Sequence, residues 1–150
     1  MNATSELLVE WLRRRRYAFA DARAISDAAA EALADGNDDD VVLALASTSD
    51  PAADVDGLIE RGLRDADVTD ADTLARTAMA GLICQEIAAG AVEPMAGARA
   101  LTTLFFEDET DTRLTVFWRL NAESDDLDNR AAIEAEIVEA ARTYLADERD

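Results

Sequence analysis

Apolar residues recur at intervals of three and four along most of this chain, the spacing of one face of an α-helix. The clearest stripe comes last, where Ile133, Ile137 and Tyr144 share a face and glutamates take much of the other side. A second stripe, which contains Leu8 and Leu12, follows the N-cap candidates Thr4 and Ser5. The same spacing predicts further helices over about residues 21–34, which Gly36 ends, and after Asp50-Pro51.

The least polar stretch of the chain lies in the middle, over residues 71–106. Residues 77–84 (TAMAGLIC) carry no charge, and the apolar positions around them cover more than half of a helical wheel. A helix that is apolar nearly all round is normally buried. Asp70 or Asp72 can cap this helix, Gly90 can end it, and Pro94 fits the first turn of the next. We therefore expect residues 71–106 to form the centre of the core.

Two short segments fit either a helix or a strand. Residues 41–46 (VVLALA) form an apolar run, and residues 114–120 (LTVFWRL) have the β-branched and aromatic content of a strand. We favour a helix for both, because neither has a clear partner strand except the other. Residues 107–112 (EDETDT) read as an exposed loop, and Asp126 or Asp128 as the cap of the last helix. The prediction is an all-α compact bundle of about seven helices, in one domain over residues 1–150.

Three helix ends resemble one another at intervals of about 55 residues, namely residues 30–36, 85–90 and 142–148. This spacing is compatible with solenoid-like repeats of helical units. Alanine-rich helices also resemble one another by chance, and that is the simpler interpretation.

The composition is rich in alanine and strongly acidic. The chain has 32 alanines, 33 Asp and Glu, 14 arginines and no lysine, for a formal net charge of −19. Such a charge repels nucleic acids and anionic membranes. Three explanations are open: adaptation to a salt-rich cytoplasm (halophilic adaptation), a surface shaped for a cationic partner, and mimicry of nucleic acid. The first is the simplest.

Several kinds of chemistry are excluded by residues that the chain lacks. Without histidine there is no Ser-His-Asp or Cys-His system and no His-ligated zinc, and without lysine there is no Schiff base or P-loop cation. Cys84 is alone inside the apolar run, so we expect no disulfide and a buried thiol. We expect no cofactor. The start of the chain does not read as a signal peptide and no segment is apolar enough for a membrane span, so we expect a cytoplasmic protein.

Acidic runs leave room for a weak site for a hard cation. Residues 35–40 (DGNDDD), 54–57 (DVDG) and 107–111 (EDETD) could offer carboxylates to calcium or magnesium. The second run resembles the start of a calcium loop, but Leu63 stands where that loop needs a glutamate. We favour solvated loops and helix caps and assign no metal ligand.

Arginine and aromatic residues gather near the start of the chain, in the composition typical of interface hot spots. The candidate interface consists of Trp11, Arg13, Arg14, Arg15, Arg16 and Tyr17. The alternative is a cationic helix that docks on the protein's own acidic surface, with its aromatic residues in the core. Four consecutive arginines point in four directions on a helix, so they cannot form a single anion pocket.

Three functions are compatible with these observations. We favour a non-enzymatic cytoplasmic protein-interaction module with an acidic surface, such as an adaptor, a regulator or an immunity-type inhibitor. Its partner is a protein or a second copy of the chain, whereas the charge disfavours nucleic acid and membranes. The alternatives are a small metal-dependent enzyme that uses Asp and Glu clusters, and a nucleic-acid mimic. We assign no catalytic residue.

Overall fold

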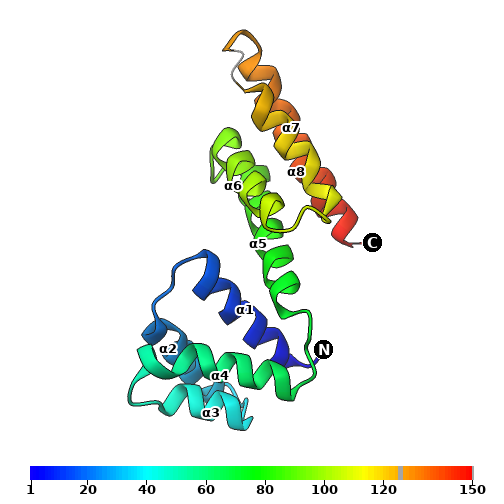
Figure 1. The fold of residues 1–150 in the computed structure, drawn as a ribbon. Helices are drawn as coiled ribbons and strands as arrows, with labels where there is room; N and C mark the ends of the chain where they lie inside the picture. The colour runs from blue at the N-terminus through cyan, green and yellow to red at the C-terminus, as the bar shows by residue number, and fades with distance from the viewer. Residues whose placement is uncertain (125–126, 150) are drawn as a thin grey trace. The chain divides into compact units, whose positions relative to one another are not determined.

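The computed structural model of this chain describes residues 1–124 and 127–149, and all of the regular structure there is helical (Figure 1). The α-helices are α1 (Ala3–Tyr17), α2 (Ala22–Ala34), α3 (Asp40–Ser47), α4 (Pro51–Asp65), α5 (Ala71–Ala88), α6 (Pro94–Glu107), α7 (Thr115–Glu123) and α8 (Arg130–Arg149). Two 3₁₀ turns, η1 (Thr112–Leu114) and η2 (Leu127–Asn129), precede α7 and α8. The prediction of an all-α bundle of about seven helices is confirmed, and both ambiguous segments are helical, in α3 and α7.

Short polar side chains cap several of the helices, and α4 begins after Asp50 as the sequence predicts. The Asp21 carboxylate accepts a hydrogen bond of 2.7 Å from the Ala24 N–H, and Asp50 caps α4 in the same way, with Pro51 in the first turn. The expected cap at Thr4 or Ser5 is wrong. Asn2 caps α1 instead, because its side chain accepts from the Ser5 N–H at 2.8 Å.

The later helix boundaries also follow the expected residues. α5 begins directly after Asp70, and Gly90 adopts the left-handed conformation that ends it. Of the two caps expected for the last helix, Asp126 lies outside the described residues and Asp128 lies in η2, just before α8. Residues 108–111 form the turn expected between α6 and η1.

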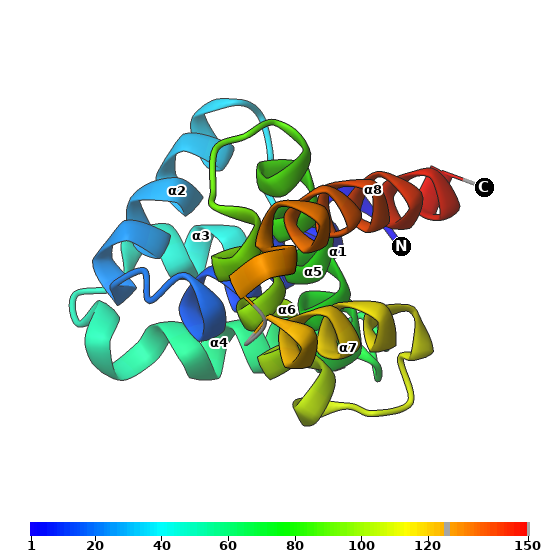
Figure 2. The same ribbon diagram turned by 90° about the horizontal axis from the view of Figure 1, so that it is seen from above.

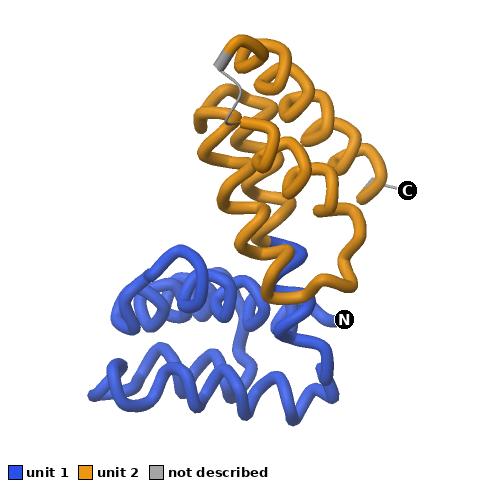
Figure 3. The backbone as a smooth tube through the Cα atoms, turned by 45° about the horizontal axis from the view of Figure 1, so that its top comes forward, with its two compact units in different colours: residues 1–78 blue, residues 79–150 orange. Residues whose placement is uncertain are grey.

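The chain divides into two compact units, residues 1–78 (unit 1) and residues 79–150 (unit 2), coloured separately in Figure 3. The boundary falls inside α5, so the apolar stretch expected to centre one core supplies residues to both units. Its first half places Ala75 in the core of unit 1, and its second half buries Ile83 and Cys84 in unit 2. The assignment of the whole chain to a single domain stays a prediction.

Unit 1 packs α1–α4 and the start of α5 around a core of aliphatic side chains and one tryptophan. Helices α2 and α3 lie side by side, as Figures 1 and 2 show, and both contact α4. The largest side chains with almost no exposed surface in this core are Leu8, Trp11, Ile25, Val42, Leu45 and Ile59. Ser26 shares the interior and donates its hydroxyl to the Leu45 carbonyl at 2.8 Å, which ties α2 to α3.

Unit 2 packs α6, α7 and α8 on one another, with α7 and α8 running in opposite directions. Its central side chains are fully buried and come from each of these helices and from η1: Leu101, Leu114, Phe117, Leu120 and Ile137. α6 also comes close to the end of α5, because a Cβ at Gly97 would meet the Ile87 side chain at 2.5 Å. Close helix packing therefore depends on small residues in this unit.

The closest helix packing in unit 1 is at Gly62 in α4. A Cβ built there would lie 2.8 Å from Cγ2 of Val41 in α3 and 2.9 Å from Cδ1 of Leu8 in α1. Real Cβ contacts are longer than this, so any larger residue at position 62 must displace the side chains of Val41 and Leu8. Gly57, in the same helix, has open space at its Cβ position.

These two glycines provide a matched pair of stability variants. Gly57→Ala is expected to raise the free energy of unfolding by about 0.5–1 kcal/mol, because alanine has the higher helix propensity. Gly62→Ala gains the same propensity but forces Leu8 and Val41 apart, and overpacking of this kind costs about 1–3 kcal/mol. Urea unfolding followed by circular dichroism measures both, and equal effects of the two substitutions would contradict the close approach at Gly62.

Candidate functional site

The four consecutive arginines of α1 bind carboxylates in three different places, as expected from their directions on a helix. Arg13 and Arg14 both lie near Glu10 on the same helix, with Arg14 Nη2 at 3.0 Å from Glu10 Oε1. Arg15 binds Asp56 in α4, and Arg16 binds Asp72 in the first turn of α5. The arginines therefore connect α1 to the acidic residues of its own unit.

The Arg15–Asp56 pair has the most complete geometry of these contacts. Arg15 Nε and Nη2 donate to the two Asp56 carboxylate oxygens at 2.8 and 2.9 Å, and Nη1 donates to the Ala20 carbonyl at 2.9 Å. This hydrogen bonding lowers the pKa of Asp56 and raises the pKa of Arg15. Both side chains are partly exposed, so the pair contributes mainly to the placement of α1 against α4 and the turn after α1.

The aromatic residues of the candidate interface lie largely inside the unit. Trp11 is 2% exposed, and Tyr17 is half-buried against the same core. Arg16 lines a groove of about 480 Å³ in unit 1, whose apolar wall includes Leu12 and Leu63. Trp11 thus belongs to the core, and the arginines form ion pairs within their own unit. This arrangement is the one expected for a cationic helix that docks on the protein's own acidic surface. An interface at the Arg13–Tyr17 segment stays a prediction.

Phe19, between α1 and α2, has an unfavourable backbone conformation. Its φ is +53°, in the left-handed region that glycine prefers, and its side chain is 88% exposed. Gly36 after α2 and Gly90 after α5 take comparable left-handed conformations at helix ends. The N–H groups of Ala18 and Ala20 both donate to the Arg14 carbonyl, so hydrogen bonds on either side of Phe19 fix this turn.

Phe19→Gly is expected to raise the free energy of unfolding by about 1 kcal/mol. The reason is that an L-residue pays about 1–2 kcal/mol in the left-handed region, while the exposed ring contributes little packing. Ala18→Gly is the control, because Ala18 is right-handed with φ −101° and glycine there only adds freedom to the unfolded chain. Urea midpoints that fall for both variants would contradict the strain at Phe19.

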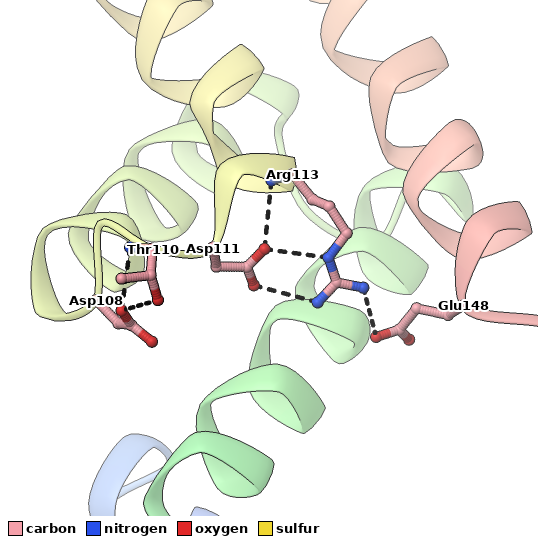
Figure 4. Close-up of polar contacts among 5 residues, drawn as sticks. All are labelled: Asp108, Thr110, Asp111, Arg113 and Glu148. Carbon is pink, nitrogen blue, oxygen red and sulfur yellow. Dashed lines mark hydrogen bonds and ion pairs between the residues drawn. The ribbon is translucent and has the colours of Figure 1, made fainter.

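The acidic runs serve as caps and turn contacts. Asp39 accepts a hydrogen bond from the Thr4 hydroxyl of α1, and Asp54 accepts one from the Thr48 hydroxyl at 2.6 Å. Asp108 accepts from the N–H and the hydroxyl of Thr110, at 3.1 and 2.5 Å (Figure 4). Among residues 1–124 and 127–149, no group of three or more Asp, Glu or Cys side chains is placed to hold a metal ion.

Arg113 of unit 2 lies among two carboxylates and an aromatic ring. Its Nε and Nη2 donate to the two oxygens of Asp111 at 3.1 and 3.2 Å, and Nη1 lies 3.7 Å from a Glu148 oxygen (Figure 4). Its guanidinium carbon is 4.7 Å from the centre of the Tyr144 ring, a cation–π distance. The contacts tie the turn before α7 to the last turns of α8.

Two buried groups beside Arg113 hold their protons strongly. Cys84 has no exposed surface, and burial, together with the charge of Glu148, raises the pKa of its thiol to about 12. Burial and Glu148 also raise the pKa of Tyr144 well above its ordinary value, against the opposing effect of Arg113. A thiol that stays protonated is a poor nucleophile, so Cys84 acts as a buried apolar residue, as the sequence predicts.

The raised pKa of Cys84 predicts a loss of stability at high pH. The thiol of the unfolded chain releases its proton near its ordinary pKa of about 8.5, whereas the folded protein holds it up to about 12. Between these values the unfolded state binds fewer protons, so the free energy of unfolding falls as the pH rises, by up to about 1.4 kcal/mol per pH unit. Cys84→Ala is expected to flatten the dependence of the free energy of unfolding on pH between about pH 8.5 and 10, as measured by urea unfolding. An unchanged slope would contradict the raised pKa of this thiol.

A pair of exposed aromatic side chains lies on α6 and α7 of unit 2. Phe106 is 57% exposed and Trp118 is 44% exposed, and their ring centres are 6.2 Å apart with the planes at 71°. Phe105 lies beneath them, stacked on Trp118 at 5.6 Å and with only 8% of its surface exposed. We name Phe106 and Trp118, with Phe105 below, the aromatic pair. The contacts between the rings hold both exposed side chains in defined positions.

Acidic residues and the end of a helix follow Phe106 in the chain. Phe106 is the second-last residue of α6, so it lies at the negative end of the helix dipole. Glu107 and Glu109 follow it and are exposed. The N–H of Asp108 donates to the carbonyls of Leu104 and Phe105.

The sequence does not single out the aromatic pair, although a signal for it exists. Each helix carries two adjacent aromatic residues, Phe105-Phe106 in α6 and Phe117-Trp118 in α7. Neighbours on a helix point about 100° apart, so a narrow apolar stripe buries only one of each two. Phe105 and Phe117 are the buried members. Phe106 and Trp118 are the outward members, and they contact each other because of how α6 packs on α7. Sequence periodicity does not show this packing.

Comparisons with known proteins identify no relative: no family model matches the chain, and neither a curated protein nor a solved structure does. Over the part of the chain that the structure describes, no helix combines the length and the apolar character that a bilayer crossing requires.

Proposed function

We propose that this protein is a non-enzymatic interaction module that binds a positively charged segment of another protein on the aromatic pair of unit 2. It acts in the cytoplasm as an adaptor, regulator or inhibitor. The observation that carries this proposal is the exposed Phe106–Trp118 pair at the acidic end of α6. The function is therefore assigned to the surface of α6 and α7.

Exposed aromatic residues in contact with one another are unusual on a protein that has so few. The chain contains eight aromatic residues, and two of them stand together in solvent while Trp11, Phe105 and Phe117 fill the cores. Tryptophan is enriched in the residues that dominate binding energy, because it buries a large area and loses little conformational entropy. The stacked Phe105 fixes Trp118 before any partner arrives, which reduces the entropy lost on binding.

The charge of the protein specifies the chemistry of the partner. Residues 79–150 carry 16 Asp and Glu against six Arg, and the whole chain has a formal charge of −19. Such a field attracts a basic segment, accelerates its encounter with the surface, and opposes the approach of a second acidic copy. A basic segment whose side chains can also pack on aromatic rings therefore matches both the negative charge and the exposed rings of the surface.

No specific observation favours either alternative function. A metal-dependent enzyme needs converging carboxylates, and the described residues hold no group of three placed to bind a metal ion. A nucleic-acid mimic needs carboxylates spaced along a face. Here Asp21 and Asp50 cap helices, and Asp56 and Asp111 bind arginine. These roles explain several acidic residues without a mimic.

A short peptide of alternating glycine and arginine, with blocked termini, tests the proposed function. We expect it to bind in low salt, and Trp118→Ala to weaken binding about 30-fold, the effect of a hot-spot residue of about 2 kcal/mol. The same peptide with glutamate in place of arginine is expected not to bind. Isothermal titration calorimetry at about 0.1 M salt and again at about 0.5 M measures the affinity and its screening.

Leu43→Ala is the matched control for this experiment. Leu43 in α3 of unit 1 is 49% exposed, close to the exposure of Trp118, and lies outside the proposed surface. This variant is expected to bind the peptide like the unmodified protein. Equal losses of peptide affinity in Leu43→Ala and Trp118→Ala would contradict the proposal. Dimers that sedimentation detects and that Trp118→Ala dissociates would also contradict it, because a second copy would then occupy the surface.

A further inference from the structure

The chain already contains one site at which an aromatic ring and carboxylates hold a guanidinium. At Arg113, the ring of Tyr144 covers one face of the guanidinium at 4.7 Å, Asp111 binds its edge with both oxygens, and Glu148 lies 3.7 Å away. Each contact uses a different property of the guanidinium: its flat face, its paired N–H groups and its charge. Figure 4 shows the carboxylates on opposite sides of the group.

The surface around the aromatic pair offers aromatic rings, exposed carboxylates and the carbonyl end of a helix. Phe106 and Trp118 present ring faces and edges at 71° to each other. Glu107 and Glu109 supply exposed carboxylates next to them in the chain. The last turn of α6, which ends at Glu107, supplies carbonyl acceptors, because the last carbonyls of a helix have no partner within it.

Arginine and lysine carry the same charge but differ in what they can do at such a surface. A guanidinium is flat, stacks on aromatic rings and offers five N–H donors in a fixed plane, which suits carboxylates and carbonyls together. An ammonium is compact and strongly hydrated; a ring face attracts its charge, but it has no flat face of its own to stack on the ring. Charge alone therefore attracts both residues equally, whereas the aromatic pair distinguishes them.

We infer that the aromatic pair, with the acidic end of α6, recognises arginine side chains in preference to lysine in its partner. This inference rests on the proposed function and adds to it the identity of the recognised residue. Net charge supports a partner other than a second copy, because two chains at −19 repel each other. The bound arginine lies against Trp118 and Phe106 and donates to the carboxylates and carbonyls that follow Phe106.

Two peptides of equal length and charge test the inference, one of alternating glycine and arginine and one of alternating glycine and lysine. We expect the arginine peptide to bind about tenfold more tightly, because the flat guanidinium stacks on the rings and its paired N–H groups bind carboxylates, which an ammonium does not match. Equal affinities would overturn the inference but leave the proposed function standing, provided that Trp118→Ala weakens both. Failure of both peptides to bind would overturn the proposed function itself.

Tryptophan emission supplies a second readout that reports on the surface directly. The protein has two tryptophans, of which Trp11 is 2% exposed and Trp118 is 44% exposed, so a neutral quencher such as acrylamide reaches mainly Trp118. The arginine peptide is expected to reduce this quenching more than the lysine peptide at equal saturation. Equal protection by the two peptides would contradict stacking on the ring.

Substitutions in the aromatic pair separate stacking from charge. Trp118→Ala and Phe106→Ala are each expected to abolish the preference for arginine, whereas Trp118→Phe keeps a ring and retains most of it. Glu107→Gln is expected to weaken both peptides by a similar factor, because it removes charge and leaves the rings in place. Circular dichroism checks that each variant is folded. A preference that persists in Phe106→Ala and Trp118→Ala would overturn the role of the rings.

Discussion

Thirty-three carboxylates and only 14 cations must be accommodated in this fold, and much of its surface chemistry follows from that constraint. Carboxylates such as Asp21 and Asp50 lie at helix starts, where backbone N–H groups and the helix dipole stabilise negative charge. Others hold arginines that join distant segments, as Asp56 does for Arg15. Several cations are thereby engaged within their own units, and the remaining surface is strongly acidic.

A strongly negative net charge does not account for an exposed tryptophan. Trp118 and Phe106 are exposed, and the buried Phe105 stacks on Trp118. The packing of α6 on α7 therefore holds an apolar surface in place on a protein of strongly negative charge. The Arg113 site shows that this combination of ring and carboxylate holds a guanidinium in the same unit. Phe19, exposed with a left-handed backbone, is another aromatic side chain in solvent for which the fold alone gives no packing reason.

Local sequence patterns predicted the helices, several of their boundaries and the burial of Cys84, because these depend on residues close together in the chain. They predicted less about contacts between residues that are far apart in the chain, because helix packing determines these contacts. The candidate interface gave weight to Trp11 and the four arginines, yet Trp11 fills the core, and Arg15 and Arg16 meet Asp56 and Asp72 from other helices. Periodicity likewise cannot show that Phe106 meets Trp118, or that two compact units share α5.

If the acidic field serves a cationic partner, as we propose, this fold must tolerate its charge without high salt. Adaptation to a salt-rich cytoplasm, the simplest explanation of the composition, predicts the opposite. Urea unfolding in KCl from about 0.1 to 3 M tests this requirement most directly, because screening of charge is largely complete near 1 M, where the Debye length is about 3 Å. We expect a cooperatively folded protein at the lowest salt and a free energy of unfolding that stops rising near 1 M. A protein that is unfolded at low salt, or whose stability climbs through 3 M, would show that the acidity is an adaptation to salt and would contradict the account.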